Sequence, residues 1–259
     1  MSTRRDLLRA AAALTLAREP LEAALKPALQ DGAPLRDAYD LDPSVRYLNH
    51  ASIGTVPSAV REALGGYLKA CEANPWAHVW SDAWTEALEL AHADVAAAMG
   101  CDADDVAVVR NTTEAFSLFA QGLELGPDDV VAFSQLNHVG ASACWEAQAA
   151  RRGFRLQQLA VPESELATSS VEDVVAAHVD ALEEDVTVLV LPHVDNNFGL
   201  RHPVPEIAAA ARARGVRWVL VDAAQTVGML PFRADELGAD AVATSAHKWL
   251  QAPKGTGLV

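Results

Sequence analysis

The feature that most constrains the fold is a regular alternation of short apolar runs with longer helix-forming stretches. Most of the runs are continuously apolar rather than alternating, which favours strands that are covered on both faces. The runs are 105–110, 129–134, 154–161, 186–194, 216–224 and 239–246, and the helical stretches between them are 113–125, 140–153, 170–184 and 205–215. This order predicts an α/β fold in three layers: a mostly parallel sheet flanked by helices, with chemical residues at the carboxyl ends of its strands.

Composition excludes several classes of function. The 259 residues are 51% hydrophobic, enough for a large core, and carry a formal net charge of −15. We therefore predict no nucleic-acid partner, because binding phosphates needs clustered Lys and Arg. No apolar stretch approaches the roughly 20 residues that span a bilayer, so no membrane partner is expected. Cys71, Cys101 and Cys144 lack CxxC spacing and an even count, so neither a disulfide framework nor a metal site is predicted.

The N-terminal region allows two interpretations. Residues 1–42, punctuated by prolines, predict a helical arm ahead of a large domain at 43–259. Residues 1–17, with Arg4 and Arg5 ahead of an apolar segment, also resemble a twin-arginine export signal. Because that segment is short, contains Arg9 and lacks a clear cleavage site, we favour the helix and a cytoplasmic location and keep export as the alternative.

Specific polar residues follow the predicted strands. Thr112 and Thr113 open a helix after 105–110, where Asn111 with Glu114 can cap it and the helix end can hold an anion. A helix cap without a ligand is the alternative. His138 follows 129–134, where a histidine is as often structural as catalytic.

The later strands end in amides, a carboxylate and an amine. The segment 193–199, which includes Asn196, follows 186–194, and Asp222 with Gln225 closes 216–224. A buried aspartate requires a cationic or metal partner. Lys248 comes after 239–246, where an apolar site would favour a neutral amine that attacks a carbonyl to form a Schiff base. The alternative is a buried ion pair between Lys248 and Asp222.

Together these residues meet the needs of pyridoxal 5'-phosphate. That cofactor requires a lysine for its aldehyde, a carboxylate for its pyridine nitrogen, a helix N-terminus for its phosphate and a flat side chain against its ring. No GxGxxG, GxxxxGK[ST] or GxSxG motif is present, which disfavours a nucleotide-binding α/β enzyme.

The chain resembles the class V aminotransferase family of pyridoxal-phosphate enzymes, which includes cysteine desulfurases, selenocysteine lyases and isopenicillin-N epimerases. The resemblance covers some four-fifths of the chain, through YLNHASIGTVP (47–57), RNTTEA, LNH, HVDNNFG, VDAAQ and SAHKW. It implies that Lys248 is the Schiff-base lysine and that Asp222 pairs with the pyridinium. His138 matches the ring-stacking residue that also shuttles protons. Asn196 and Gln225 match side chains near the phenolic oxygen. The phosphate-binding positions are Thr112, Thr113, Ser245 and His247.

The resemblance also implies a reaction class. We expect an amino-acid substrate, an aldimine with Lys248 and a quinonoid intermediate, leading to epimerisation, transamination or C–S lyase (desulfurase) chemistry. The segments HKWLQAPKG and YLNHASIG favour the epimerase-like branch, in which residues 49–54 would lie near the substrate. A homodimer is expected if the family architecture is complete. Cys144 is expected to be a buried thiol rather than a sulfur acceptor.

This sequence departs from the family at its end. The family continues into a smaller C-terminal domain beyond the position of Val259, and we expect that domain to be absent from this chain. The alternative function is therefore a non-catalytic remnant that keeps the cofactor-binding fold and acts as a binding or assembly partner.

Overall fold

The chain forms two compact units, which are described separately. The computed structural model describes residues 35–80, 85–161 and 168–259. Unit 1 contains the described residues up to Val108, with Val227–Arg233 and Ala246–Leu258. Unit 2 contains Val109–Thr226, Ala234–Ser245 and Val259. The predicted boundary at residue 42 stays a prediction. The proposed export signal, and the arm up to residue 34, lie outside the described residues.

Unit 2 is built on a five-stranded sheet in which every neighbouring pair is parallel. Its strands are β2 (Val130–Ser134), β3 (Arg155–Leu159), β4 (Val186–Pro192), β5 (Trp218–Asp222) and β6 (Ala241–Ala243), in the order β3-β2-β4-β5-β6. Every residue of β2 and β4 is buried, as expected for continuous apolar runs. The prediction of a mostly parallel sheet is confirmed.

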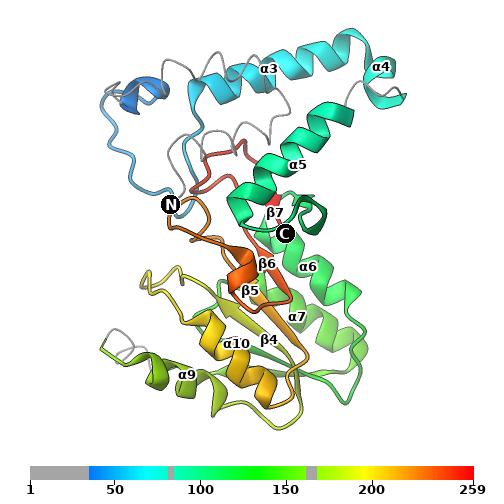
Figure 1. The fold of residues 1–259 in the computed structure, drawn as a ribbon, viewed down its shortest axis with the longest axis vertical. Helices are drawn as coiled ribbons and strands as arrows, with labels where there is room; N and C mark the ends of the chain where they lie inside the picture. The colour runs from blue at the N-terminus through cyan, green and yellow to red at the C-terminus, as the bar shows by residue number, and fades with distance from the viewer. Residues whose placement is uncertain (1–34, 81–84, 162–167) are drawn as a thin grey trace. The chain divides into compact units, whose positions relative to one another are not determined.

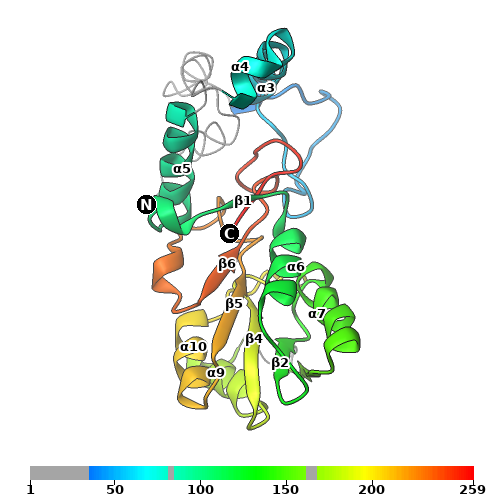
Figure 2. The ribbon, with the colours of Figure 1, turned by 90° about the vertical axis from the view of Figure 1, so that its right-hand side faces the viewer.

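Helices cover both faces of this sheet. Figures 1 and 2 show α6 and α7 on one face and α9 and α10 on the other, so the predicted three layers are present. Their bounds are α6 (Thr112–Gly122), α7 (Val139–Arg152), α9 (Val171–Val179) and α10 (Val204–Ala213). Phe116 of α6 and Trp145 of α7 are fully buried against Val131 of β2 and Val188 of β4. This core fixes the strand ends that carry the candidate site.

The first predicted strand, 105–110, is mostly not a strand. Asp105 lies in the 3₁₀ turn η3 (Ala103–Asp105), and only β1 (Val108–Val109) forms a paired strand within 105–110. β1 pairs with β7 (Gly257–Leu258) in a separate two-stranded sheet rather than joining the main one. The last predicted run, 239–246, is likewise shortened to β6, because a short turn η4 (Ala234–Glu236) precedes it and the chain turns after Thr244.

Unit 1 is largely helical. It contains η1 (Leu35–Ala38), α3 (Ser58–Ala73), α4 (Pro75–Trp80) and α5 (Thr85–Met99). α3 buries only Val60, whereas α5 buries Ala91, Val95, Ala96 and Met99. Among the described helices, none has the length and apolar character needed to cross a bilayer.

Candidate functional site

The candidate site residues of unit 2 gather at one edge of the sheet. The strands are parallel, so their carboxyl ends meet at that edge. β3 and β4 lie on opposite sides of β2, so the chain changes direction there, which is where ligands bind in open α/β sheets. The predicted residues in unit 2 are Thr112, Thr113, His138, Asn196, Asp222, Gln225 and Ser245. His247 and Lys248 belong to unit 1.

Two hydroxyl groups meet at the N-terminus of α6. Ser245 Oγ accepts a hydrogen bond from the Thr112 N–H at 3.1 Å and lies 2.8 Å from Thr112 Oγ1. Both side chains are buried. The unpaired N–H groups and the dipole of a helix N-terminus favour an anion. The structure therefore brings together two of the four predicted phosphate-binding residues.

The predicted cap of α6 is only half correct. Asn111 Oδ1 accepts the Glu114 N–H at 2.8 Å, as expected. The Glu114 carboxylate, however, accepts the Arg110 N–H at 2.6 Å and also binds the Arg110 guanidinium. The guanidinium attracts the carboxylate away from the reciprocal position on Asn111 and holds the pKa of Glu114 below its ordinary value.

The N-terminus of α7 approaches that of α6. The Gly140 N–H donates to His138 Nδ1 at 3.0 Å, so a neutral His138 ring carries its proton on Nε2. A Cβ atom at Gly140 would lie 2.4 Å from Thr113 Oγ1. Only glycine therefore fits at position 140 beside the side chains of Thr113 and His138. The sequence reasoning missed Gly140; a glycine in the first turn of an otherwise helical stretch was the available signal.

Asp222 is held at the end of β5 by its neighbours. Its side chain is buried, and Oδ1 accepts the Ala224 N–H at 2.9 Å. Its backbone oxygen accepts the His193 N–H at 2.8 Å, which ties β5 to the end of β4. Gln225, three residues later, is also buried. A buried carboxylate fixed in this way can hold a cationic ring nitrogen.

A second buried carboxylate shapes the loop after β4. Asp195 accepts the backbone N–H groups of Asn197, Phe198 and Leu200 at 2.7–3.0 Å. Asn196 is exposed on this loop and donates from Nδ2 to Asn197 Oδ1 at 3.0 Å. Asp195 therefore fixes the backbone that displays Asn196. Sequence reasoning noted the polar cluster but gave Asp195 no role.

Three histidines are buried behind this loop. The rings of His178 and His202 meet edge to face with centroids 5.4 Å apart, and His202 Nε2 lies 3.5 Å from Asp195 Oδ2. Burial lowers the pKa of His193 and of His202 to about 4, although the Asp195 carboxylate partly opposes the shift at His202. Burial also lowers the pKa of His178. The cluster is therefore neutral at pH 7.

In unit 1, Lys248 lies in a tight turn against Gly54. The Gly54 N–H donates to the His247 oxygen at 2.7 Å, and a Cβ atom at Gly54 would lie 2.0 Å from the Lys248 oxygen. The Trp249 ring stacks on the His50 ring with centroids 5.9 Å apart. Gly54 therefore has to be a glycine for the 49–54 segment to contact the Lys248 turn.

His247 is half-buried in the same turn. Its Nδ1 lies 3.3 Å from the Thr256 oxygen, so Nδ1 donates and a neutral ring offers Nε2 as an acceptor. Burial lowers the pKa of His247. This side chain can hold an anion through Nε2 only when the ring is protonated, which a bound anion would favour.

Among the described residues, no cluster of His, Cys, Asp or Glu suits a metal ion. Burial raises the pKa of the Cys144 thiol on α7 to about 11, so the group stays protonated at neutral pH. Cys144 is half-buried rather than fully buried as predicted. A protonated thiol is a poor nucleophile.

Comparison of the sequence with known proteins finds relatives that share most of this chain. The chain is 31% identical over 232 residues to the isopenicillin N epimerase of Streptomyces clavuligerus, covering 90% of this chain and 57% of that protein. It is 36% identical over 220 residues to a probable cysteine desulfurase of Pseudomonas aeruginosa, covering 82% and 52%. The chain thus spans about half the length of the curated relatives it matches.

Solved structures share the fold. A C-DES mutant with glycine covalently linked to the PLP cofactor matches with a TM-score of 0.77 at 24% identity, covering 87% of this chain and 58% of that one. The apo cysteine desulfurase of Thermococcus onnurineus matches with a TM-score of 0.71 at 24% identity, covering 86% and 55%. The family model described as aminotransferase class-V matches residues 46–259. The chain belongs to the aminotransferase class-V family.

Proposed function

We propose that this chain binds pyridoxal 5'-phosphate, forms a carbon–nitrogen bond to it through Lys248, and acts on an amino-acid substrate. The observation that carries the proposal is the meeting of Thr112, Ser245 and Asp222 at one sheet edge of unit 2. Family membership supports it, because a solved structure of the same fold holds this cofactor.

The residues of unit 2 fit the cofactor group by group. The buried hydroxyls of Thr112 and Ser245 at the α6 N-terminus suit a phosphate dianion. The buried Asp222 carboxylate suits a protonated ring nitrogen. His138 offers an exposed, flat imidazole at the adjoining helix N-terminus, and Asn196 offers an exposed amide. Lys248 follows Ser245 by three residues along the chain, which links the amine to the phosphate-binding set.

When bound, the cofactor supplies an electron-withdrawing ring that makes the substrate's α-hydrogen acidic. Within the chain, Asp222 would hold the ring nitrogen in its protonated form, because a buried carboxylate favours a positive charge beside it. Lys248 would hold the cofactor through its amine, and the same amine would serve as the base that removes or returns the α-proton. The Nε2–H of His138 is the second group that can move a proton.

The finer proposal is an isopenicillin-N epimerase-like activity, with aminotransferase and desulfurase chemistry as the other outcomes. It rests on HKWLQAPKG, on YLNHASIG and on the similarity to the Streptomyces clavuligerus epimerase. The protonated Cys144 disfavours a sulfur-accepting role for that thiol. A homodimer and a cytoplasmic location are further proposals, which gel filtration of the purified chain and cell fractionation would test.

A second candidate is a binding or assembly partner that keeps the cofactor-binding fold without turnover. Turnover of any amino acid by this chain alone would rule it out. Cofactor binding without turnover, even at high enzyme concentration, would support it.

Two measurements test the main proposal. Addition of pyridoxal phosphate should produce an absorption band distinct from that of the free cofactor. The band should be absent in Lys248→Ala and retained in Lys69→Ala, a matched change of a lysine on exposed α3. In D₂O, the loaded protein should exchange the α-hydrogen of its amino-acid substrate for deuterium. A full band in Lys248→Ala would contradict the assignment of Lys248.

A further inference from the structure

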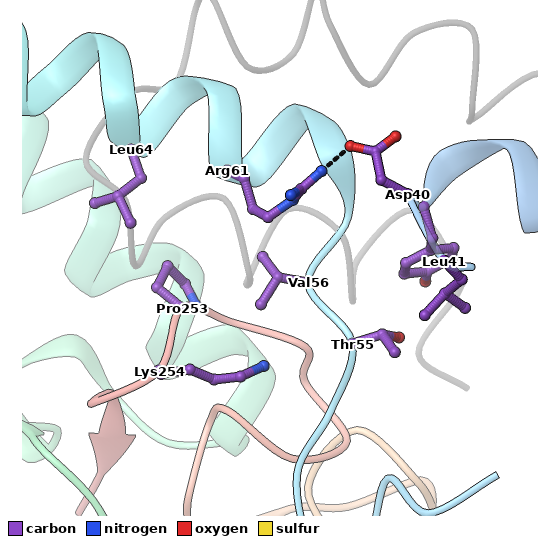
Figure 3. A pocket seen from close by; sticks show the side chains of 9 residues that line it. Asp40, Leu41, Thr55, Val56, Arg61, Leu64, Pro253 and Lys254 are labelled. Carbon is purple, nitrogen blue, oxygen red and sulfur yellow. Dashed lines mark hydrogen bonds and ion pairs between the residues drawn. The ribbon is translucent and has the colours of Figure 1, made fainter. Parts of the chain in front are cut away.

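A cavity of about 440 Å³ lies within unit 1. Figure 3 shows its walls: residues before α3, the first turns of α3, and the loop that follows Trp249. The volume falls within the range of small-molecule sites in proteins. Neither the cofactor proposal nor the sequence reasoning gave this cavity a role.

Most of the wall is apolar. Val56, Leu64 and Pro253 line one part of the cavity and Leu41 lines another. Figure 3 shows these side chains around a common space, with Lys254 extending into it from the Pro253 loop. Such a wall favours the hydrocarbon part of a ligand.

The polar end of the cavity carries an ammonium group without a carboxylate partner. Lys254 Nζ donates to the Gly54 oxygen, and within the described residues it forms no ion pair. An ammonium has three donors, so two remain for a ligand. Lys254 is partly buried, and this burial lowers the pKa of its ammonium group. A ligand anion would compensate the charge of that group.

The second cation is already paired. The Arg61 guanidinium binds the Asp40 carboxylate at an exposed position on the rim. The cavity thus offers one uncompensated positive charge, which matches a singly charged anion. A phosphate dianion would need further donors, such as the hydroxyl and helix-end groups found in unit 2.

We propose that this cavity is a binding site for a small organic acid, whose carboxylate pairs with Lys254 and whose apolar body packs on Val56, Leu64 and Pro253. This inference rests on the residues of unit 1 alone and not on the proposed cofactor function.

The experiment uses isovalerate as the probe and the whole chain without added cofactor, with binding followed by saturation-transfer NMR and calorimetry. Lys254→Gln removes the charge but keeps an N–H donor for the Gly54 oxygen, so the loop contact can persist. We expect it to weaken isovalerate binding about tenfold or more, as for loss of a charge-assisted hydrogen bond. Lys69→Gln, a lysine outside the cavity, should leave the affinity unchanged.

Two further measurements distinguish the contribution of the ligand's carboxylate from that of its apolar body. Isovaleramide has the same shape without the charge and should bind wild-type protein at least about tenfold more weakly. Leu64→Ala should weaken isovalerate binding while retaining the preference for the acid over the amide. Absence of isovalerate binding to the wild-type chain, or equal affinities for Lys254→Gln and wild type, would overturn the proposal. Equal binding of acid and amide would do the same.

Discussion

The two units differ in how their residues are held in place. In unit 2, β2 and β4 are wholly buried and a continuous core joins α6 and α7 to the sheet. In unit 1, the 16 residues of α3 bury only Val60, and Leu68 and Trp76 are 58% and 73% exposed. The candidate site residues of unit 2 thus lie at the ends of buried strands. Unit 1 holds Lys248 by local turns and leaves Leu68 and Trp76 largely exposed.

The largest expected effect compares two tryptophans. Trp145 is fully buried in the unit 2 core, and its indole N–H donates to the Ala141 oxygen at 3.1 Å. Trp145→Ala should cost about 3–5 kcal/mol of unfolding free energy, measured by urea denaturation. Trp76→Ala, at an exposed position of α4, should cost less than about 0.5 kcal/mol. Similar losses of unfolding free energy in the two variants would contradict the difference in packing between the two units.

The next effect is acid destabilisation of unit 2. His193 and His202 have a pKa of about 4 in the fold against 6.5 when unfolded, so the unfolded chain binds more protons between these values. Stability should therefore be complete above about pH 6.5 and fall as the pH drops towards 4. Each histidine contributes on the order of 3 kcal/mol.

Unfolding free energies measured across this pH range check the prediction. Replacing His202 with Gln should flatten the slope relative to the wild-type chain. A profile that is equally steep in this variant and in the wild type would place the acid sensitivity outside the buried cluster of His178, His193 and His202.

Two glycines sharpen the comparison within unit 1. A Cβ atom at Gly54 would meet the Lys248 oxygen at 2.0 Å, whereas one at Gly65 on α3 has no neighbour within 4 Å. Gly54→Ala should cost about 1–3 kcal/mol by overpacking the turn. Gly65→Ala should stabilise α3 by about 0.5–1 kcal/mol. Thermal unfolding should show a lower melting temperature for Gly54→Ala and a higher one for Gly65→Ala. Melting temperatures that shift in the same direction would refute the close packing at Gly54.

The smallest effect concerns the hydroxyl pair at α6. Ser245→Ala removes the acceptor of the Thr112 N–H and should weaken pyridoxal phosphate binding about tenfold. Ser117→Ala, farther along α6, removes a hydroxyl that donates only to the Thr113 oxygen and should leave the affinity unchanged. A fluorescence titration distinguishes the two variants. Unchanged affinity in Ser245→Ala would exclude Ser245 from the phosphate site.

The sequence predicted those parts of the fold and site that local pattern encodes. Continuous apolar runs predicted the buried strands, and the residues that follow them meet at one sheet edge because the strands are parallel. The cluster of His178, His193 and His202 was not predictable, since its members come from three separate segments. The Glu114 carboxylate binds Arg110 instead of capping the Asn111 backbone. The spacing of Asn111 and Glu114 alone does not reveal this competition. The Lys254 cavity requires α3 and a loop almost 200 residues later.

The central claim is that Lys248, of the four lysines in the chain, carries the cofactor. The most direct measurement is reduction of the protein–pyridoxal phosphate complex with borohydride, followed by mass-spectrometric mapping of the modified peptide. We predict one cofactor per chain on Lys248. Modification of Lys26, Lys69 or Lys254 in its place, or no modification of any lysine, would contradict the account.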